Sequence, residues 1–98
     1  MASAPAEIEV GPETQRDGAW AYDVTVFAAG RVRRHAVTLS FQDYDLWSRG
    51  RVGPSRVAHA AVRYWLDQPD AEPLPEAFDC SRLRRHFPDA DAELPGRL

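Results

Sequence analysis

The stretch AWAYDVTVFAAGRVRRHAVTLS, Ala19 to Ser40, decides the fold of this 98-residue chain. Its first half places large apolar side chains on one side and small or polar ones on the other, and the apolar set is Trp20, Tyr22, Val24 and Val26. After a turn at Gly30 the alternation resumes, with His35, Val37 and Leu39 on one face. A period of two is typical of half-buried strands. The stretch therefore predicts a β-hairpin over residues 20–39, and the short alternating segment EIEV at 7–10 can add an edge strand.

Two helical patterns follow the hairpin. Phe41 to Arg49 begins after Ser40, which with Asp43 resembles a capping box. Residues 55–67, bounded by Gly53-Pro54 and Pro69, carry an apolar stripe: Val57, Ala58, Ala61, Val62 and Trp65. The opposite face is polar and is expected in solvent: Arg56, His59, Arg63 and Asp67.

Strands that are apolar on one face and a helix with one apolar stripe are expected to bury these surfaces against each other. We therefore expect an α+β fold, a small antiparallel β-hairpin or three-strand meander followed by two to three helices. The predicted core is Trp20, Val24, Val26, Val37, Leu39, Val57, Ala61 and Trp65. Residues 7–88 are expected to form the single domain, after a flexible leader at 1–6 and before a frayed acidic tail at 89–98.

The segment FDCSRLRRHFP, Phe78 to Pro88, predicts a third, short helix. Its three arginines spread around a helix axis at 100° per residue, whereas Leu83 and Phe87 share one face. A helix that reads a nucleic-acid groove needs its basic residues on one side. We therefore expect a docked structural element, with Leu83 and Phe87 buried and the arginines in solvent.

Composition bounds the function classes. A single cysteine, Cys80, excludes an internal disulfide framework and a cysteine-rich zinc site, and it is expected to be structural. The three histidines have no metal-ligand spacing and are expected at the surface or at edges: His35, His59 and His86. No catalytic, cofactor or metal site is predicted, and we expect no enzyme. Without a signal-like start or a long apolar run, we expect a cytoplasmic protein without membrane contact.

The net charge of −3 hides a pattern. Residues 31–66 carry seven arginines against Asp43 and Asp45, a net charge of +5, whereas residues 1–30 and 67–98 each carry −4. A basic middle can attract an anion, but we expect the acidic ends to neutralise it in the fold. The alternative is contact with an anionic partner at one end of the second strand, through Arg31, Arg33, Arg34 and His35.

The segments YDVTVF, HAVTLSFQDYDLW, SRVAHAAVRYWL and FDCSRLRRHFP together resemble a family of short bacterial proteins with no established function. The closing element, F-D-x-S followed by F-P, is the most specific part, although His86 and Cys80 stand where aliphatic residues are expected. The resemblance covers most of residues 22–89. It implies the fold and a bacterial cytosolic setting, and it implies no reaction.

A weaker similarity links residues 33–66 to ribbon–helix–helix repressors, in which strands of two chains pair and enter the major groove. Arg31, Arg33 and His35 would then form one alternating set. The favoured interpretation is instead a non-enzymatic interaction or regulatory module with an unknown protein partner. A ribbon–helix–helix-like DNA-binding regulator is the alternative, and nucleic acid is the less favoured partner. The oligomeric state, a homodimer included, stays open.

Overall fold

The computed structural model describes residues 6–98. Three long strands come first, and they are β1 (Glu7–Arg16), β2 (Ala19–Ala28) and β3 (Arg31–Ser40). Two helices, a short strand and four short helical segments follow: α1 (Phe41–Ser48), α2 (Pro54–Asp67), β4 (Ala77–Asp79), η1 (Cys80–Arg82), α3 (Leu83–His86), α4 (Ala90–Glu93) and η2 (Leu94–Arg97). The predicted leader lies outside the described residues, except for Ala6, which packs partly buried against the core.

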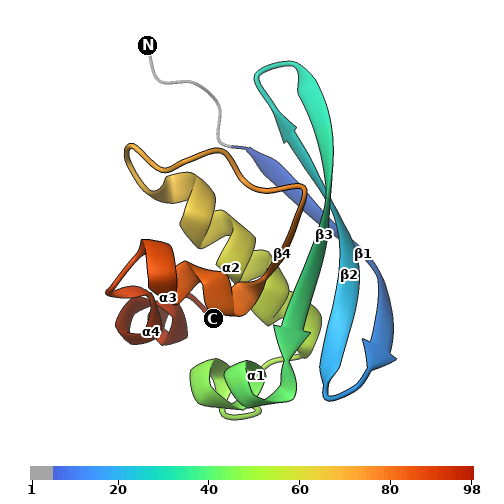
Figure 1. The fold of residues 1–98 in the computed structure, drawn as a ribbon, viewed down its shortest axis with the longest axis vertical. Coiled ribbons are helices and arrows are strands. Elements are labelled where there is room, and N and C mark those ends of the chain that lie inside the picture. The colour runs from blue at the N-terminus through green and yellow to red at the C-terminus, as the bar shows by residue number, and fades with distance from the viewer. Residues whose placement is uncertain (1–5) are drawn as a thin grey trace.

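The sheet has the order β1-β2-β3-β4, and its first three strands form an antiparallel meander. β4 adds in parallel to residues 36–38 of β3. The helices cover one face of this sheet, as Figure 1 shows. The predicted α+β fold with a three-strand meander is confirmed, and β4 is an addition that the sequence pattern did not predict.

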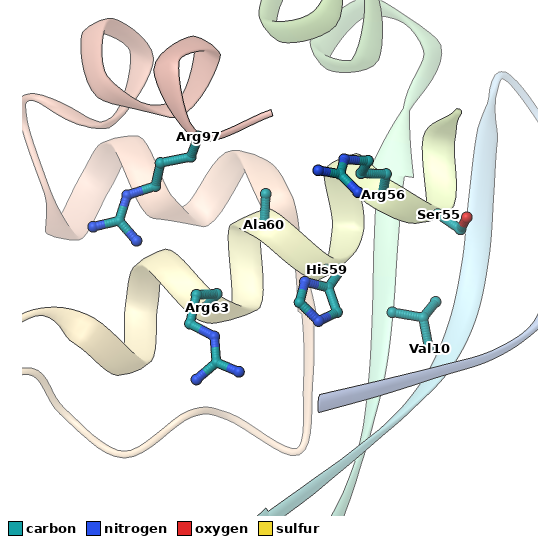
Figure 2. A pocket seen from close by; sticks show the side chains of 7 residues that line it. All are labelled: Val10, Ser55, Arg56, His59, Ala60, Arg63 and Arg97. Atoms are coloured by element: carbon teal, nitrogen blue, oxygen red, sulfur yellow. The ribbon is translucent and has the colours of Figure 1, made fainter. Parts of the chain in front are cut away.

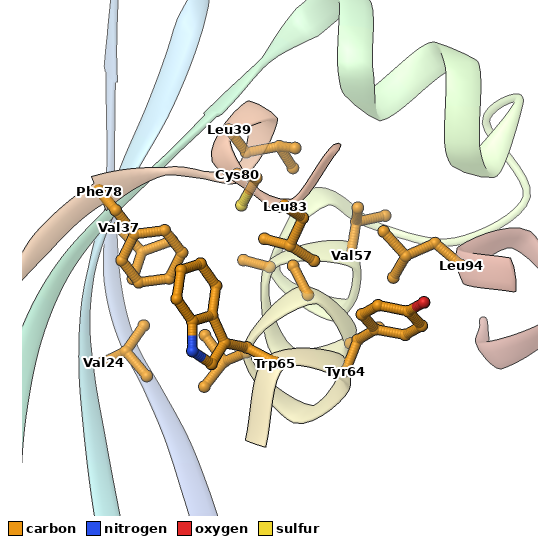
Figure 3. Packing of buried hydrophobic residues seen from close by; sticks show 14 of the residues in the cluster. Val24, Val37, Leu39, Val57, Tyr64, Trp65, Phe78, Cys80, Leu83 and Leu94 are labelled. Carbon is orange, nitrogen blue, oxygen red and sulfur yellow. The ribbon is translucent and has the colours of Figure 1, made fainter. Parts of the chain in front are cut away.

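The core lies between the sheet and α2. Val24 and Val26 are buried whereas Thr25 between them is not, so the predicted side of the strands is correct. Figure 3 shows Val24 and Val37 facing Trp65 across this interface. All the predicted core residues are buried except Trp20, which stays half-buried because it packs at the end of the sheet against the rings of Phe41 and Tyr44.

Of the two contacts predicted for the capping box of α1, one is present. The Ser40 hydroxyl accepts a hydrogen bond from the backbone N–H of Asp43 at 3.0 Å. The Asp43 carboxylate, however, is buried and binds Arg84 at 2.8 Å. A long-range ion pair has therefore taken the place of the local return contact.

The C-terminal segment differs from the prediction in three respects. Leu83 is fully buried, but Phe87 is only half-buried, with its ring edge-on to those of Tyr64 and Trp65. Arg84 is partly buried in ion pairs instead of lying in solvent, whereas Arg82 and Arg85 are exposed as expected. The last residues are helical instead of frayed, because Ala90 and Leu94 are completely buried against the helices.

Among residues 6–98, no helix combines the length and the apolar character that crossing a membrane requires.

Candidate functional site

The arginines of the basic middle are not neutralised by direct ion pairs. In the described part of the chain, ion pairs form only at Arg84 and Arg97, and none involves an arginine between 31 and 66. Arg84 instead binds Asp43, one of the only two acids of that middle segment. The expected neutralisation of the basic middle by the acidic ends therefore involves no direct ion pair among residues 6–98, and it stays a prediction for charges at longer range.

Three polar residues of α2 and the buried Ala60 between them lie on one side of the helix. Arg56, His59, Ala60 and Arg63 follow the spacing i, i+3, i+4 and i+7, which places them in a row. Ala60 is small, so it leaves space between its long neighbours.

That row lines a pocket of about 540 Å³ between α2 and β1. We call this pocket the basic pocket. Figure 2 shows the residues that line it: Val10, Ser55, Arg56, His59, Ala60, Arg63 and Arg97. Val10 comes from β1 and Arg97 from η2, so three separate parts of the chain meet here. The lining contains three guanidinium groups and no carboxylate.

The positive charge around the basic pocket affects the pKa of His59. Partial burial lowers the pKa of His59 from its ordinary value of 6.5, and the cations of Arg63 and Arg56 lower it further. At pH 7 its imidazole is therefore neutral, with one ring nitrogen as a donor and the other as an acceptor. The positive charge of the pocket comes from its arginines, which stay charged at every physiological pH.

Arg97 is held in position at the rim. Its guanidinium binds Asp67 at 2.8 Å and lies 4.9 Å from the ring centre of Tyr64. The Tyr64 hydroxyl donates to Glu93 at 2.5 Å, and burial together with this bond raises the pKa of Tyr64 to about 12. Asp67, which the helical spacing could pair with Arg63, thus binds Arg97 and leaves Arg63 without a carboxylate partner.

Of the four residues predicted to contact an anionic partner at one end of β3, three are exposed and one is buried. Arg31, Arg33 and Arg34 are exposed, and none of them is in an ion pair within residues 6–98. His35 is buried, and its Nδ1 lies 2.6 Å from the carbonyl oxygen of Pro75. Because a carbonyl only accepts, this Nδ1 carries the proton and donates. His35 therefore lies at the edge of the sheet but not at the surface, and it joins β3 to the loop before β4.

The other candidate groups have structural surroundings. Cys80 is completely buried, and this burial raises the pKa of its thiol well above the ordinary range, as expected for a structural cysteine. His86 is exposed and its ring lies 4.8 Å from that of Trp65. No group of three His, Cys, Asp or Glu side chains within residues 6–98 could hold a metal ion.

Sequence reasoning had identified Arg56, His59 and Arg63 as a helix face but had assigned that face to solvent. It had not connected Arg97 with them, because no local pattern links positions so far apart. Comparison of the chain with protein-family models, with curated proteins and with solved structures found no match.

Proposed function

We propose that this protein is a non-enzymatic interaction or regulatory module that binds an anionic protein partner through the basic pocket. The observation that carries the proposal is the charge of the lining, which has three guanidinium groups and no carboxylate. Guanidinium groups present a planar set of donors that matches carboxylates in two-point contacts. In a protein of net charge −3, Arg56 and Arg63 of this lining form no ion pair among residues 6–98, whereas Arg97 is paired with Asp67.

The arrangement of the arginines favours an elongated partner. Arg56 and Arg63 are seven residues apart, which is about 10 Å along a helix axis. Arg97, which is paired with Asp67, borders the pocket from a different element, η2. A row of carboxylates on a polypeptide fits this spread better than a single compact anion does.

A binding experiment with matched charge changes tests the proposal. Fluorescence anisotropy would measure the affinity for a labelled peptide rich in glutamate. We expect Arg56→Glu/Arg63→Glu to weaken binding at least about tenfold, which corresponds to about 1.4 kcal/mol. The control is Arg82→Glu/Arg85→Glu, which makes the same change of charge at two exposed positions outside the pocket. Equal losses in the two variants would contradict the proposal, and so would the absence of any binding by the unchanged protein.

The alternative is a ribbon–helix–helix-like DNA-binding regulator, and the exposed Arg31, Arg33 and Arg34 favour it. Its strand would have to pair with a second chain. β2 pairs with the whole of β3, and β4 occupies the other edge at 36–38, so only residues 31–35 offer a free edge.

Duplex binding measured against salt concentration tests this alternative. Phosphate contacts make affinity fall steeply with salt, and Arg33→Glu/Arg34→Glu should remove that dependence. If the unchanged protein shows no duplex binding at low salt, the DNA-binding alternative is wrong.

A further inference from the structure

Besides residues 31–35 of β3, the sheet has a free edge at β1. The strand order places β1 at one end of the sheet, where its only partner among residues 6–98 is β2. Its outer edge therefore presents backbone donors and acceptors that have no strand beside them, and such an edge can accept another chain. The pairing with β2 is regular from Glu7 to Val10 and is interrupted by a bulge between Val10 and Glu13. The pairing is regular again from Glu13 to Arg16, but Val10 lines the basic pocket, so residues 7–10 are the part of the edge that adjoins it.

The basic pocket adjoins this edge. The Val10 side chain lines the pocket together with the polar face of α2, and Figure 2 shows it close to His59. Figure 1 shows α2 running in roughly the opposite direction to β1. A chain placed along the outer edge of β1 would therefore extend beside the arginines of the helix.

From this juxtaposition we propose that the partner is an extended acidic peptide, which adds to the sheet as a strand beside β1 and directs alternate carboxylates into the basic pocket. This inference rests on the proposed function and specifies its partner. Backbone hydrogen bonds to residues 7–10 would supply the pairing. Arg56 and Arg63, which form no ion pair among residues 6–98, would select the side chains, while Arg97 stays paired with Asp67 at the rim. Three side chains at alternate positions of an extended peptide span about 13 Å, which covers the distance between Arg56 and Arg63 along the helix.

The charges of β1 indicate which side chains the peptide should carry on the face that points away from α2. Successive side chains of a strand point to opposite faces, so Glu7 and Glu9 are exposed on the face away from α2, while Ile8 and Val10 are half-buried on the helix side. Like charges in adjacent strands repel each other and opposite charges attract. The intervening residues of the peptide should therefore be basic or neutral, and the predicted ligand alternates acidic with basic residues.

A second copy of this chain fits the edge less well. Antiparallel pairing of two β1 strands would place the glutamates of both copies together on one face of the joined sheet. It would also bring Ile8 and Val10, and not carboxylates, to the arginines of each pocket. Charge complementarity therefore favours the acidic peptide.

Backbone methylation of a test peptide distinguishes strand addition from charge attraction alone. The probe is the labelled peptide EKEKEKE, and the composition control is EEEEKKK. In an added strand, the N–H groups of alternate residues point toward β1. N-methylation of either the glutamates or the lysines should therefore weaken binding at least about tenfold, while methylation of the other set should change it less than about threefold. Hydrogen exchange of the amides of residues 7–10 should slow in the complex.

The outcomes separate this inference from the proposed function. If both methylated peptides bind as well as EKEKEKE and binding still depends on Arg56 and Arg63, strand addition is wrong while the basic pocket keeps its role. Equal affinity for EKEKEKE and EEEEKKK would also contradict strand addition. If neither peptide binds while the glutamate-rich peptide does, strand addition is wrong and the basic pocket keeps its role; if none of the three binds, both proposals fail. Protection of residues 7–10 that increases with protein concentration in the absence of peptide would assign the edge to a second copy and overturn the inference.

Discussion

At the scale of single residues, Arg84 connects the neighbouring helices α3 and α4 to α1, which is distant in sequence. Its guanidinium binds Asp43 of α1 at 2.8 Å and Asp91 of α4 at 3.1 Å, and it lies 5.7 Å from the ring centre of Trp47. The Trp47 indole N–H donates to the same Asp91 at 2.7 Å. The hydrogen bonds to Asp91 and Asp43 raise the pKa of Arg84 further above its ordinary value. Removing Arg84 would leave the carboxylates of Asp43 and Asp91 without this partner, and that loss would lower the stability of the fold.

We expect Arg84→Ala to lower the free energy of unfolding by about 1–3 kcal/mol, because the buried Asp43 carboxylate would lose its partner. Arg85→Ala is the matched control, since Arg85 is exposed, forms no ion pair among the described residues and should cost at most about 0.5 kcal/mol. Urea unfolding of the two variants measures the difference. Equal midpoints would mean that the Arg84 ion pairs contribute nothing.

The Asp91 carboxylate makes part of the stability depend on pH. The hydrogen bond from Arg84, with a further one from Trp47, holds the pKa of Asp91 below its ordinary value in the folded protein. In the unfolded chain the pKa returns to about 3.9. The folded state therefore binds this proton more weakly, so the contribution is present above the unfolded pKa and is lost as the pH falls through the lower folded pKa.

Asp91→Asn keeps an acceptor for Trp47 and removes the charge, so its effect should follow this titration. The gap in urea midpoint between the unchanged protein and Asp91→Asn should be largest near neutral pH and should shrink below about pH 4. Asp45→Asn is the control, because Asp45 is exposed and forms no ion pair among residues 6–98. A gap for Asp91→Asn that does not change with pH would show that the ion pair is not its source.

At the scale of elements, β1 depends on its bulge. Pro12 has no N–H to donate, so a regular ladder cannot continue through it on the paired side. The bulge between Val10 and Glu13 accommodates this residue, and beyond it Glu13 accepts a hydrogen bond from the Tyr22 hydroxyl at 2.6 Å. Gly11 lies within the bulge, and a Cβ there would come within 2.8 Å of the backbone oxygen of Asp23.

Gly11→Ala should therefore destabilise the protein by about 1–3 kcal/mol, because β1 or β2 must shift to admit the methyl group. Gly96→Ala is the control, since a Cβ at Gly96 meets nothing within 4 Å. Thermal unfolding of the two variants checks the prediction. A Gly11→Ala midpoint as high as that of Gly96→Ala would show that the bulge has room to adjust.

At the scale of the whole molecule, the C-terminal residues close the core. Leu94 and Ala90 are completely buried, and the side chains of Asp91 and Glu93 bind Trp47 and Tyr64. Figure 3 shows Leu94 beside Val57 and Tyr64 at the end of the core that lies away from the sheet. The acidic residues after Pro88 thus belong to the packing of α1 and α2.

A chain that ends at Pro88 tests the predicted domain limits of 7–88. The loss of the buried Leu94 alone should cost about 2–5 kcal/mol, a large part of the roughly 5–15 kcal/mol available to a domain. We expect a strongly lowered urea midpoint and a weakened near-ultraviolet circular dichroism signal from the aromatic residues. Leu94→Ala in the full chain should reproduce part of the loss. A truncated chain with an unchanged midpoint would mean that residues 89–98 are dispensable.

The sequence by itself determined the elements whose pattern is local. Alternation in β2 and β3 specified the side of each strand, and the apolar stripe of α2 specified the face that meets the sheet, because both signals repeat within a few residues. The arginine-rich face of α2 was readable in the same way. What it could bind was not, since a row of arginines on a helix looks the same whether it is solvated or lines a pocket.

Only the tertiary structure decided the contacts between distant residues. His35 and Pro75 are 40 residues apart, Arg84 and Asp43 are 41 apart, and Arg97 and Asp67 are 30 apart. No repeating sequence pattern links the two members of any of these pairs. Each pair forms because core packing brings the two backbone segments together. The same packing places Arg97 and Val10 beside α2, so the basic pocket and its neighbouring free strand edge exist only once the chain has folded.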